Sequence, residues 1–364
     1  MSEMRPLLVD SAARLFERHC TRAVFEASEK MQWQQDLWDA LEAAGLPRAS
    51  RNEARGGDGA DLGDALALVR EAGRACLPAP LAETLLAELL LAEAGLAPMP
   101  GPLTASGMLD GDTLQLVKRD GSWALSGRLH RVPWGRHARA VVAVAACDGR
   151  LATVVVEKPP LIEAGSNYAG EPRDDLQFDG LAVPDRLVAV ACAMAPQRQR
   201  VLGAAFRAAA MAGALERVLA MTIRYAQERQ QFGRPIGKFQ AVQQQIAVLA
   251  AEVAAAGAAV DAMLDTVGVS AADFEIGMTK SRVSEAAGTA TAIAHQVHGA
   301  IGFTHEHALH RSTRRLWAWR DEYGTEGEWA EWVGRCIAGL SSSEALWPFI
   351  TAKEALLSGS SPEH

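Results

Sequence analysis

The sequence is poor in aromatic residues and has no concentrated run of basic ones. Aromatic residues make up 6% of the 364 residues, while alanine and leucine dominate, and this composition favours helix over sheet. The net charge is −8, and there is no stripe of lysine and arginine that could follow a phosphate backbone, so we expect no nucleic-acid partner. The G-x-S-x-G turn is also absent, which argues against a hydrolase of that type.

The cysteines are dispersed and form no CxxC pair. Thiols in this pattern are typical of a reduced, cytoplasmic protein and not of a disulfide framework or a zinc site. The N-terminus has no basic segment followed by an apolar one, so we expect no signal peptide. No apolar run reaches the roughly 20 residues of a membrane span, so we expect no span either. The five cysteines are Cys20, Cys76, Cys147, Cys192 and Cys336.

The length of the chain predicts about two or three domains. The amino-acid composition changes twice along it. Leucine and alanine recur at helical spacing up to the proline-rich segment 98–102. Short valine-rich runs then alternate with Asp-Gly turns, and long alanine-rich segments follow. We predict an α+β fold with an N-terminal α-helical domain (1–100), a middle β-barrel or sandwich domain (101–192) and a C-terminal antiparallel helical bundle (193–364).

Two further stretches are interpreted as loops. The glycine-rich residues Arg55–Gly59 could be taken for a phosphate loop, but no strand precedes them and no Gly-Lys-Ser/Thr follows. We interpret them as a loop before a helix that Asp61 caps. The residues after Leu357 are predicted to be disordered.

The stretch Ile223–Gln240, IRYAQERQQFGRPIGKFQ, begins as a helix and is then broken. A Phe-Gly pair interrupts the helix formers, and Pro235 cannot continue a helix because it has no N–H. The break places Arg229, Gln231 and Phe232 together at a helix end. A guanidinium, an amide and an aromatic ring suit a ligand with a diphosphate and a flat ring, although a capped corner with solvated charges would use the same residues.

The order of helical domain, β domain and helical bundle resembles the acyl-CoA dehydrogenase family over essentially the whole chain. Residues 224–243, RYAQERQQFGRPIGKFQAVQ, are similar to that family's R-x-x-F-G-x-x-[ILV]…Q segment. Residues 296–311, QVHGAIGFTHEHALHR, are similar to its Q-x-x-G-G-x-G-[FY] segment. The resemblance implies FAD and an acyl-CoA substrate: a carboxylate removes the α proton of the thioester while the β hydrogen leaves as hydride to the flavin.

The resemblance also implies an oligomer, because in this family the first motif reaches the FAD of a neighbouring chain. Arg229 would contact the pyrophosphate, and the second motif would lie near the adenine half of the same FAD. The implied partners are a second acyl-CoA dehydrogenase subunit or a second copy of this chain in a tetramer, and a flavoprotein that accepts electrons. The cofactor contacts implied in this way are Arg229, Gln231, Phe232, Gln296, His298, Gly299 and Thr325.

The chain departs from the family at the catalytic base. The family's usual glutamate lies in a Y-E-G-T segment, and the matching position here is Tyr323, within DEYGTE. A tyrosine, with an ordinary pKa near 10, is a poor base for this proton. Some family members place the glutamate earlier, at a position that matches Gly203 or an adjacent residue, and no carboxylate lies there. The catalytic base is therefore unknown, with Glu322 and Glu326 as the alternative candidates.

The chain also departs at the residues that contact the flavin. The family's T-E-P-x-x-G-S-D segment is reduced to Leu103–Gly107, and its W-[IV]-[ST]-N segment is replaced by Arg131–Trp134. Pro133 stands in the place of the hydroxyl residue and has no N–H to offer. A base-lacking subunit of a heteromer, similar to those of steroid-degrading bacteria, would account for these losses together. The alternatives are a self-sufficient homotetramer, a different flavoenzyme on the same fold, and a binding or regulatory protein that keeps the fold.

Two other groups of polar residues call for an interpretation. His305, His307 and His310 resemble a metal cluster, but in a helix only His307 and His310 share a face and no cysteine completes a site, so we predict no metal site. Arg207 lies in an otherwise apolar helix and must either pair with a carboxylate or face a pocket.

Overall fold

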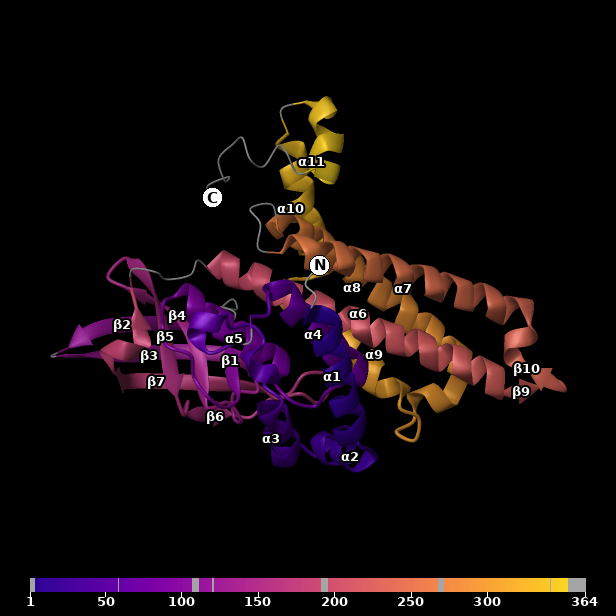
Figure 1. Cartoon of the computed structure of the whole chain (residues 1–364), viewed down its shortest axis with the longest axis horizontal. Helices are drawn as coiled ribbons and strands as arrows, with labels where there is room; N and C mark the ends of the chain where they lie inside the picture. Colours follow the sequence, from indigo (N-terminus) through magenta and orange to yellow (C-terminus); the bar gives the residue numbers. More distant parts are fainter. Residues whose placement is uncertain are drawn as a thin grey trace.

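The computed structural model describes residues 4–57, 59–106, 111–119, 121–190, 196–267, 272–340 and 342–352. Helices at the start of the chain pack between a sheet on one side and a long helical bundle on the other (Figure 1). The predicted order of helices, strands and helical bundle is thereby confirmed. The predicted disordered tail lies outside the described residues.

The N-terminal helices are α1 (Met4–His19), α2 (Arg22–Glu29), α3 (Gln35–Ala43), α4 (Leu62–Ala75) and α5 (Leu81–Glu93). Helix α4 begins at Asp61 with a capping box, since Asp61 accepts from the Asp64 amide and Asp64 accepts from the Asp61 amide. This agrees with the prediction of a loop followed by a helix capped by Asp61. Helix α5 buries leucines on nearly every face, so it forms part of the core between the sheet and the bundle.

The middle region forms one eight-stranded mixed sheet in the order β6-β7-β3-β2-β4-β5-β8, with β1 pairing β4 in parallel. Most neighbours are antiparallel, and β3 pairs with β7 along most of its length. The valines of β4 and β5 are buried on both faces, which explains the valine-rich runs in the sequence. The strands are β1 (Leu103–Ala105), β2 (Thr113–Arg119), β3 (Ser122–Pro133), β4 (Ala140–Cys147), β5 (Arg150–Glu157), β6 (Leu161–Glu163), β7 (Arg173–Val183) and β8 (Val188–Ala189).

The C-terminal region is built around α6, which begins beside the sheet and ends at the far tip of the bundle (Figure 1). Small residues let α6 lie close to α4: a side chain on Gly213 would overlap the Arg70 carbonyl, and one on Gly73 would overlap the Ala210 carbonyl. The helices are α6 (Pro196–Glu228), α7 (Gln240–Thr266), α8 (Ala272–His298), α9 (Leu309–Asp321), α10 (Glu326–Ala338) and α11 (Leu346–Ala352).

The break predicted after Glu228 is a short hairpin. Strand β9 (Gln230–Gln231) pairs with β10 (Arg234–Pro235), and Phe232 and Gly233 both have positive φ at its turn. Phe232 is 92% exposed. The hairpin therefore presents its aromatic tip to solvent at the end of the bundle.

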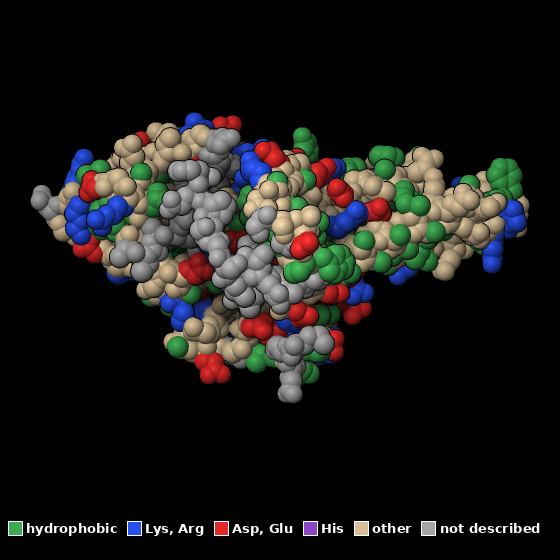
Figure 2. Space-filling model, turned by 90° about the horizontal axis from the view of Figure 1, so that it is seen from above, with side chains coloured by type: hydrophobic (Ala, Val, Ile, Leu, Met, Phe, Trp, Pro, Cys, Tyr) green, Lys and Arg blue, Asp and Glu red, His purple; other side chains and the backbone are tan. Residues whose placement is uncertain are grey.

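Helix α7 differs from the sequence expectation. It is long and apolar enough to cross a membrane. Only 28% of its most apolar 18-residue stretch is buried against the rest of the chain. Figure 2 shows apolar side chains along the arm that contains α7, with few charged ones between them. Length and hydropathy alone are weak grounds for a membrane span, because the helices that pack inside bundles meet the same criteria.

Candidate active site

A cavity of about 980 Å³ lies where the end of β3, the start of α6 and the end of α9 come together. Val132 and Pro133 line it from the sheet, and Arg200 lines it from α6. Glu322 and Tyr323 line it from the loop after α9. The structure thus brings the Arg131–Trp134 segment and the segment of the expected base into one pocket, although they are far apart in the sequence.

Gly203 and Tyr323, the two positions at which the resemblance would place a catalytic glutamate, face each other. Gly203 is buried in α6, and a side chain on it would overlap the ring of Tyr323. Burial raises the pKa of the Tyr323 phenol to about 12. Neither position therefore holds a group that accepts a proton at neutral pH.

Glu322 is a carboxylate, but both of its oxygens are engaged by arginines. Arg173 donates to Oε1 through Nη2 at 2.6 Å and Nε at 2.8 Å, and Arg207 Nε donates to Oε2 at 2.6 Å. Asn167 Nδ2 also donates to Oε1 at 3.2 Å. Burial by itself would raise the pKa of Glu322, but the two guanidinium groups outweigh it and lower the pKa to about 2. A carboxylate with so low a proton affinity is a poor general base.

The ion pairs of Glu322 belong to a larger buried network. Arg207 also donates to Glu83 of α5 at 2.7 Å, and so it pairs with two carboxylates instead of facing an open pocket. On the other side, Arg173 pairs with Glu171, which in turn pairs with Arg315 at 3.1 Å. Three arginines thus neutralise three glutamates, as buried charges require. The network connects α5, α6, α9 and the start of β7.

The loop that carries Tyr323 is fixed by backbone contacts. Tyr323 has φ of 58° and Gly324 of 103°, so the chain turns sharply there. The Trp329 indole donates to the Tyr323 carbonyl at 3.0 Å. The fully buried Lys280 donates from Nζ to the Arg320 carbonyl at 2.7 Å and to the Gly324 carbonyl at 2.8 Å. These bonds hold the Tyr323 ring over Gly203.

The two motifs at the other end of α6 also meet. Tyr225 of α6 stacks on His298 at the end of α8, with ring centroids 4.4 Å apart. Arg229 and Gln296 are both exposed near this contact, and no acidic side chain of the described residues pairs with Arg229. Gly299 follows with φ of 62°, which explains why glycine occurs there.

The cavity and the motif end are too far apart to share one ligand within a single chain. Helix α6 has 33 residues and is therefore about 50 Å long. Gly203 lies near its start and Arg229 just beyond its end, so about 40 Å of helix separates them. A single dinucleotide does not cover that distance.

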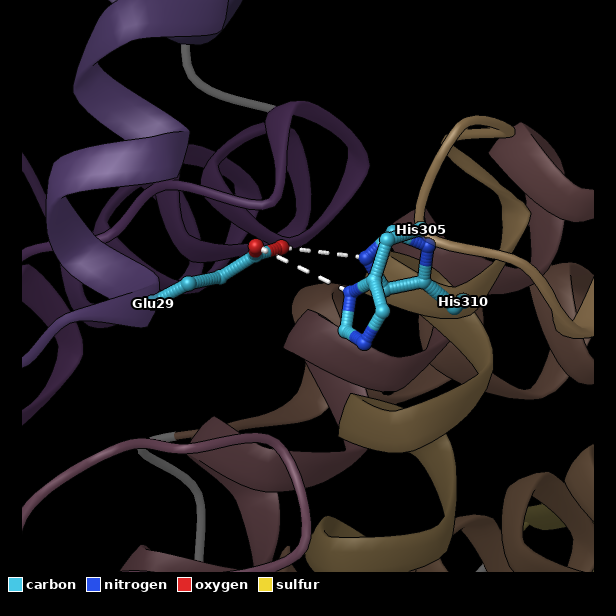
Figure 3. A group of neighbouring side chains, drawn as sticks. All are labelled: Glu29, His305 and His310. Atoms are coloured by element: carbon cyan, nitrogen blue, oxygen red, sulfur yellow. Dashed lines mark hydrogen bonds and ion pairs between the residues drawn. The ribbon is translucent and has the colours of Figure 1, made fainter.

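The three histidines lie differently from the helical arrangement that the sequence suggested. Helix α9 begins at Leu309, so His305 and His307 precede it. His307 faces Tyr225, with ring centroids 6.0 Å apart. His305 and His310 instead converge on Glu29 of α2 (Figure 3).

Comparisons with known proteins identify the chain. Residues 2–97 match the acyl-CoA dehydrogenase N-terminal domain, and residues 200–327 match the acyl-CoA dehydrogenase C-terminal domain. The acyl-CoA dehydrogenase IpdE2 of Mycobacterium tuberculosis is 31% identical over 317 residues, which cover 86% of this chain and 91% of that protein. The chain belongs to the acyl-CoA dehydrogenase family. FAD is the cofactor of the dehydrogenases with this fold.

Solved structures of acyl-CoA dehydrogenases superpose on this chain over nearly its full length. The Tcur3481–Tcur3483 steroid ACAD aligns with a TM-score of 0.80 at 25% identity and covers 92% of this chain and 98% of that one. The ChsE4–ChsE5 complex from Mycobacterium tuberculosis aligns with a TM-score of 0.83 at 23% identity and covers 94% of this chain and 99% of that one, which shows the shared fold.

Among the described residues, the end of β3 offers the cavity few free backbone donors. Pro133 has no N–H, and the Arg131 amide already donates to Asp175 at 2.9 Å. Arg131 has φ of 51° and Trp134 of 54°, so the end of β3 has an unusual backbone. The family's usual flavin contacts fit poorly here, in agreement with the sequence interpretation.

The remaining predicted site residues have structural roles that the sequence did not reveal. Thr325 caps α10 in a capping box with Glu328, and it does not line the cavity. Glu326, the second alternative base, pairs with Arg320 and also lies outside the cavity lining. The cofactor roles of Arg229, Gln231 and Phe232, like those of Gln296, His298 and Gly299, stay predictions.

Sequence reasoning missed the partners of Glu322. Arg173 lies at the start of a strand and Glu83 in an apolar helix, so nothing in the sequence connects them. One feature of the sequence could have pointed to these pairs. Glu83 and Arg207 are charged residues within otherwise apolar helices, and a buried charge needs a partner of opposite charge.

Proposed function

We propose that this chain is the base-lacking subunit of a heteromeric acyl-CoA dehydrogenase. The observation that carries the proposal is the packing of Tyr323 on Gly203, which closes both base positions, together with the double ion pair that occupies Glu322. Two further carboxylates line the cavity, Asp321 and Glu328, and both are exposed. Glu328 accepts from the backbone and hydroxyl of Thr325 and pairs with Arg200, and these contacts lower its pKa. The base for α-proton removal then belongs to the partner subunit.

In this proposal, the chain contacts the FAD of a neighbouring subunit through the exposed groups at the far end of α6. When bound, FAD supplies the hydride acceptor of the dehydrogenation. The exposed Arg229 guanidinium suits a pyrophosphate. Gln231 and Phe232 lie in the adjoining hairpin, and Gln296 lies two residues before His298, which stacks on Tyr225 of α6. Because this end lies about 40 Å along α6 from Gly203 at the cavity, the groups would serve a FAD whose flavin lies in another chain.

Exposed apolar surface supports an oligomer. Phe232 is almost fully exposed at the hairpin tip, and α7 leaves an apolar face uncovered within one chain. A second subunit against this face would bury both. The steroid ACAD and the ChsE4–ChsE5 complex among the structural relatives support a heteromer that acts on a steroid-derived acyl-CoA thioester. We further propose that electrons leave to an electron-transferring flavoprotein.

Coexpression tests the proposal. The chain is purified alone and together with a second acyl-CoA dehydrogenase subunit from the same organism, and three quantities are measured: FAD absorbance, subunit ratio by native mass spectrometry, and acyl-CoA-dependent dye reduction. We expect little FAD and no turnover from the chain alone, and a yellow, active complex with both subunits. A chain that alone holds one FAD per subunit and reduces dye would overturn the proposal. A colourless protein in both preparations would favour a binding protein instead.

A pair of variants tests the cofactor contact. Arg229→Ala in the complex should lower the FAD content and raise the concentration of FAD needed to restore activity. The matched control is Arg234→Ala, in the same hairpin, whose guanidinium lies over the Phe239 ring at 4.3 Å. Equal FAD content in Arg229→Ala and the wild-type complex would contradict the role of Arg229.

A further inference from the structure

Two histidines at the end of the second motif form, with Glu29 of α2, a group of ligands that the dehydrogenase reaction does not use. Glu29 at the end of α2, His305 in the loop and His310 in α9 turn their polar atoms toward one another (Figure 3). His310 Nε2 lies 3.0 Å from Glu29 Oε1, and His305 Nδ1 lies 3.9 Å from Glu29 Oε2. One ligand atom from each of the three residues lies within 4.8 Å of the other two.

We propose that Glu29, His305 and His310 form a binding site for Zn²⁺ or a similar divalent transition metal. Bonds of about 2.0–2.2 Å from a tetrahedral zinc to nitrogen and oxygen place the ligand atoms roughly 3.3–3.6 Å apart. The distance of 3.0 Å from His310 Nε2 to Glu29 Oε1 is slightly shorter than that spacing, and the distance of 3.9 Å from His305 Nδ1 to the other oxygen, Oε2, is slightly longer. His305 is 79% exposed and precedes α9, so its side chain is free to make the small adjustment. Two imidazoles and one carboxylate leave a fourth position for water.

The surroundings of His310 support a metal. Its Nδ1 lies 2.8 Å from the His307 carbonyl, which can only accept, so the Nδ1 proton is fixed there. Nε2 therefore presents its lone pair to the Glu29 carboxylate unless a cation lies between them. A metal ion between the two groups would accept this lone pair and the carboxylate oxygen together. A metal-bound histidine that donates its other N–H to a backbone carbonyl is the arrangement that holds imidazole ligands in place.

Neighbouring side chains affect the affinity of this site for a metal ion. Arg311 Nε lies 3.8 Å from Glu29 Oε1 and competes with the metal for the carboxylate. His307 is not a ligand, because its ring lies against Tyr225 and His298 and its Nδ1 accepts from the Leu309 amide at 3.3 Å. We therefore expect micromolar binding. The metal would join the N-terminal helices to the loop after Phe303, which belongs to the second motif.

Zinc titration of the chelator-treated full chain, by calorimetry and by competition with a chromogenic chelator, tests the site. We expect one zinc per chain and at least tenfold weaker binding in Glu29→Gln and in His305→Gln. His307→Gln is the matched control in the same loop and should bind like the wild type. Co²⁺ in place of Zn²⁺ should give visible absorption of tetrahedral intensity that is lost in His305→Gln.

Three results would overturn the proposal. They are the absence of binding at micromolar zinc, binding that is unchanged in both ligand variants, and loss of binding in His307→Gln alone. His305 is exposed, so His305→Gln should fold normally, and its circular dichroism melting curve without zinc should match that of the wild type. Zinc should raise the melting temperature of the wild type and of His307→Gln but not that of His305→Gln.

Discussion

Replacing Glu322 by glutamine separates a structural role of this carboxylate from a catalytic one. The substitution keeps the size of the side chain but removes the charge that Arg173 and Arg207 share. Without this carboxylate, the buried guanidinium groups of Arg173 and Arg207 would lose a negative charge that both of them contact. Removing one partner of a buried ion pair costs about 3–5 kcal/mol in general.

The pKa of Glu322 gives an independent estimate. It is lowered from 4.5 to about 2, and this difference corresponds to about 3 kcal/mol of folding free energy at neutral pH. Because the pKa is lower in the folded state, the contribution is fully present above pH 4.5 and is lost as the pH falls through about 2. At pH 3.5 it should have fallen to about 2 kcal/mol. The two estimates agree at neutral pH.

Urea denaturation followed by tryptophan fluorescence measures this effect at pH 7 and at pH 3.5, with the m-values compared to check that the same transition is observed. We expect Glu322→Gln to unfold with about 3 kcal/mol less free energy than the wild type at pH 7 and with a smaller deficit at pH 3.5. The control is Glu326→Gln, four residues on, whose ion pair with Arg320 is about one-third exposed and should contribute less than about 1 kcal/mol. A deficit below about 1 kcal/mol in Glu322→Gln, or one that does not shrink in acid, would refute the reasoning.

Substitutions at three further positions test the α4–α6 contact, the α4 cap and the Tyr323 loop. Gly213→Ala should lower the free energy of unfolding by about 1–3 kcal/mol, because the new methyl would overlap the Arg70 carbonyl; an unchanged urea midpoint would contradict the close helix contact. Asp61→Ala should cost about 1 kcal/mol through loss of the α4 cap, and Asp61→Asn should restore most of it in the same assay. Trp329→Phe should cost about 1 kcal/mol because the Tyr323 carbonyl loses its indole donor, and a melting temperature equal to the wild type would argue against that bond.

The departure from the family's chemistry could be found from the sequence because it concerns residue identity. Tyrosine at position 323, glycine at 203 and proline at 133 lack the groups that the reaction needs, whatever the fold does with them. The helix break after Glu228 was equally local, since Pro235 and the Phe-Gly pair end a helix wherever they occur. The capping of α4 by Asp61 depends on residues three apart and was predicted for the same reason.

Contacts between distant segments could not be predicted in this way. The sequence left Glu322 as an alternative base, and only the fold brings Arg173 from the sheet and Arg207 from α6 onto its two oxygens. The three histidines formed a cluster in the sequence, but the end of α2 brings Glu29 to two of them and leaves His307 with Tyr225.

The sequence by itself determined which groups this protein possesses, because side-chain chemistry and local backbone limits are properties of each residue and its neighbours. Only the tertiary structure decided which of those groups are buried and ion-paired and which are left without such a partner. Burial and ion pairing depend on segments that meet across α6, and these fix the charge and the proton affinity of Glu322. The length of α6 also decided that the motif end and the cavity belong to different ligand sites within one chain.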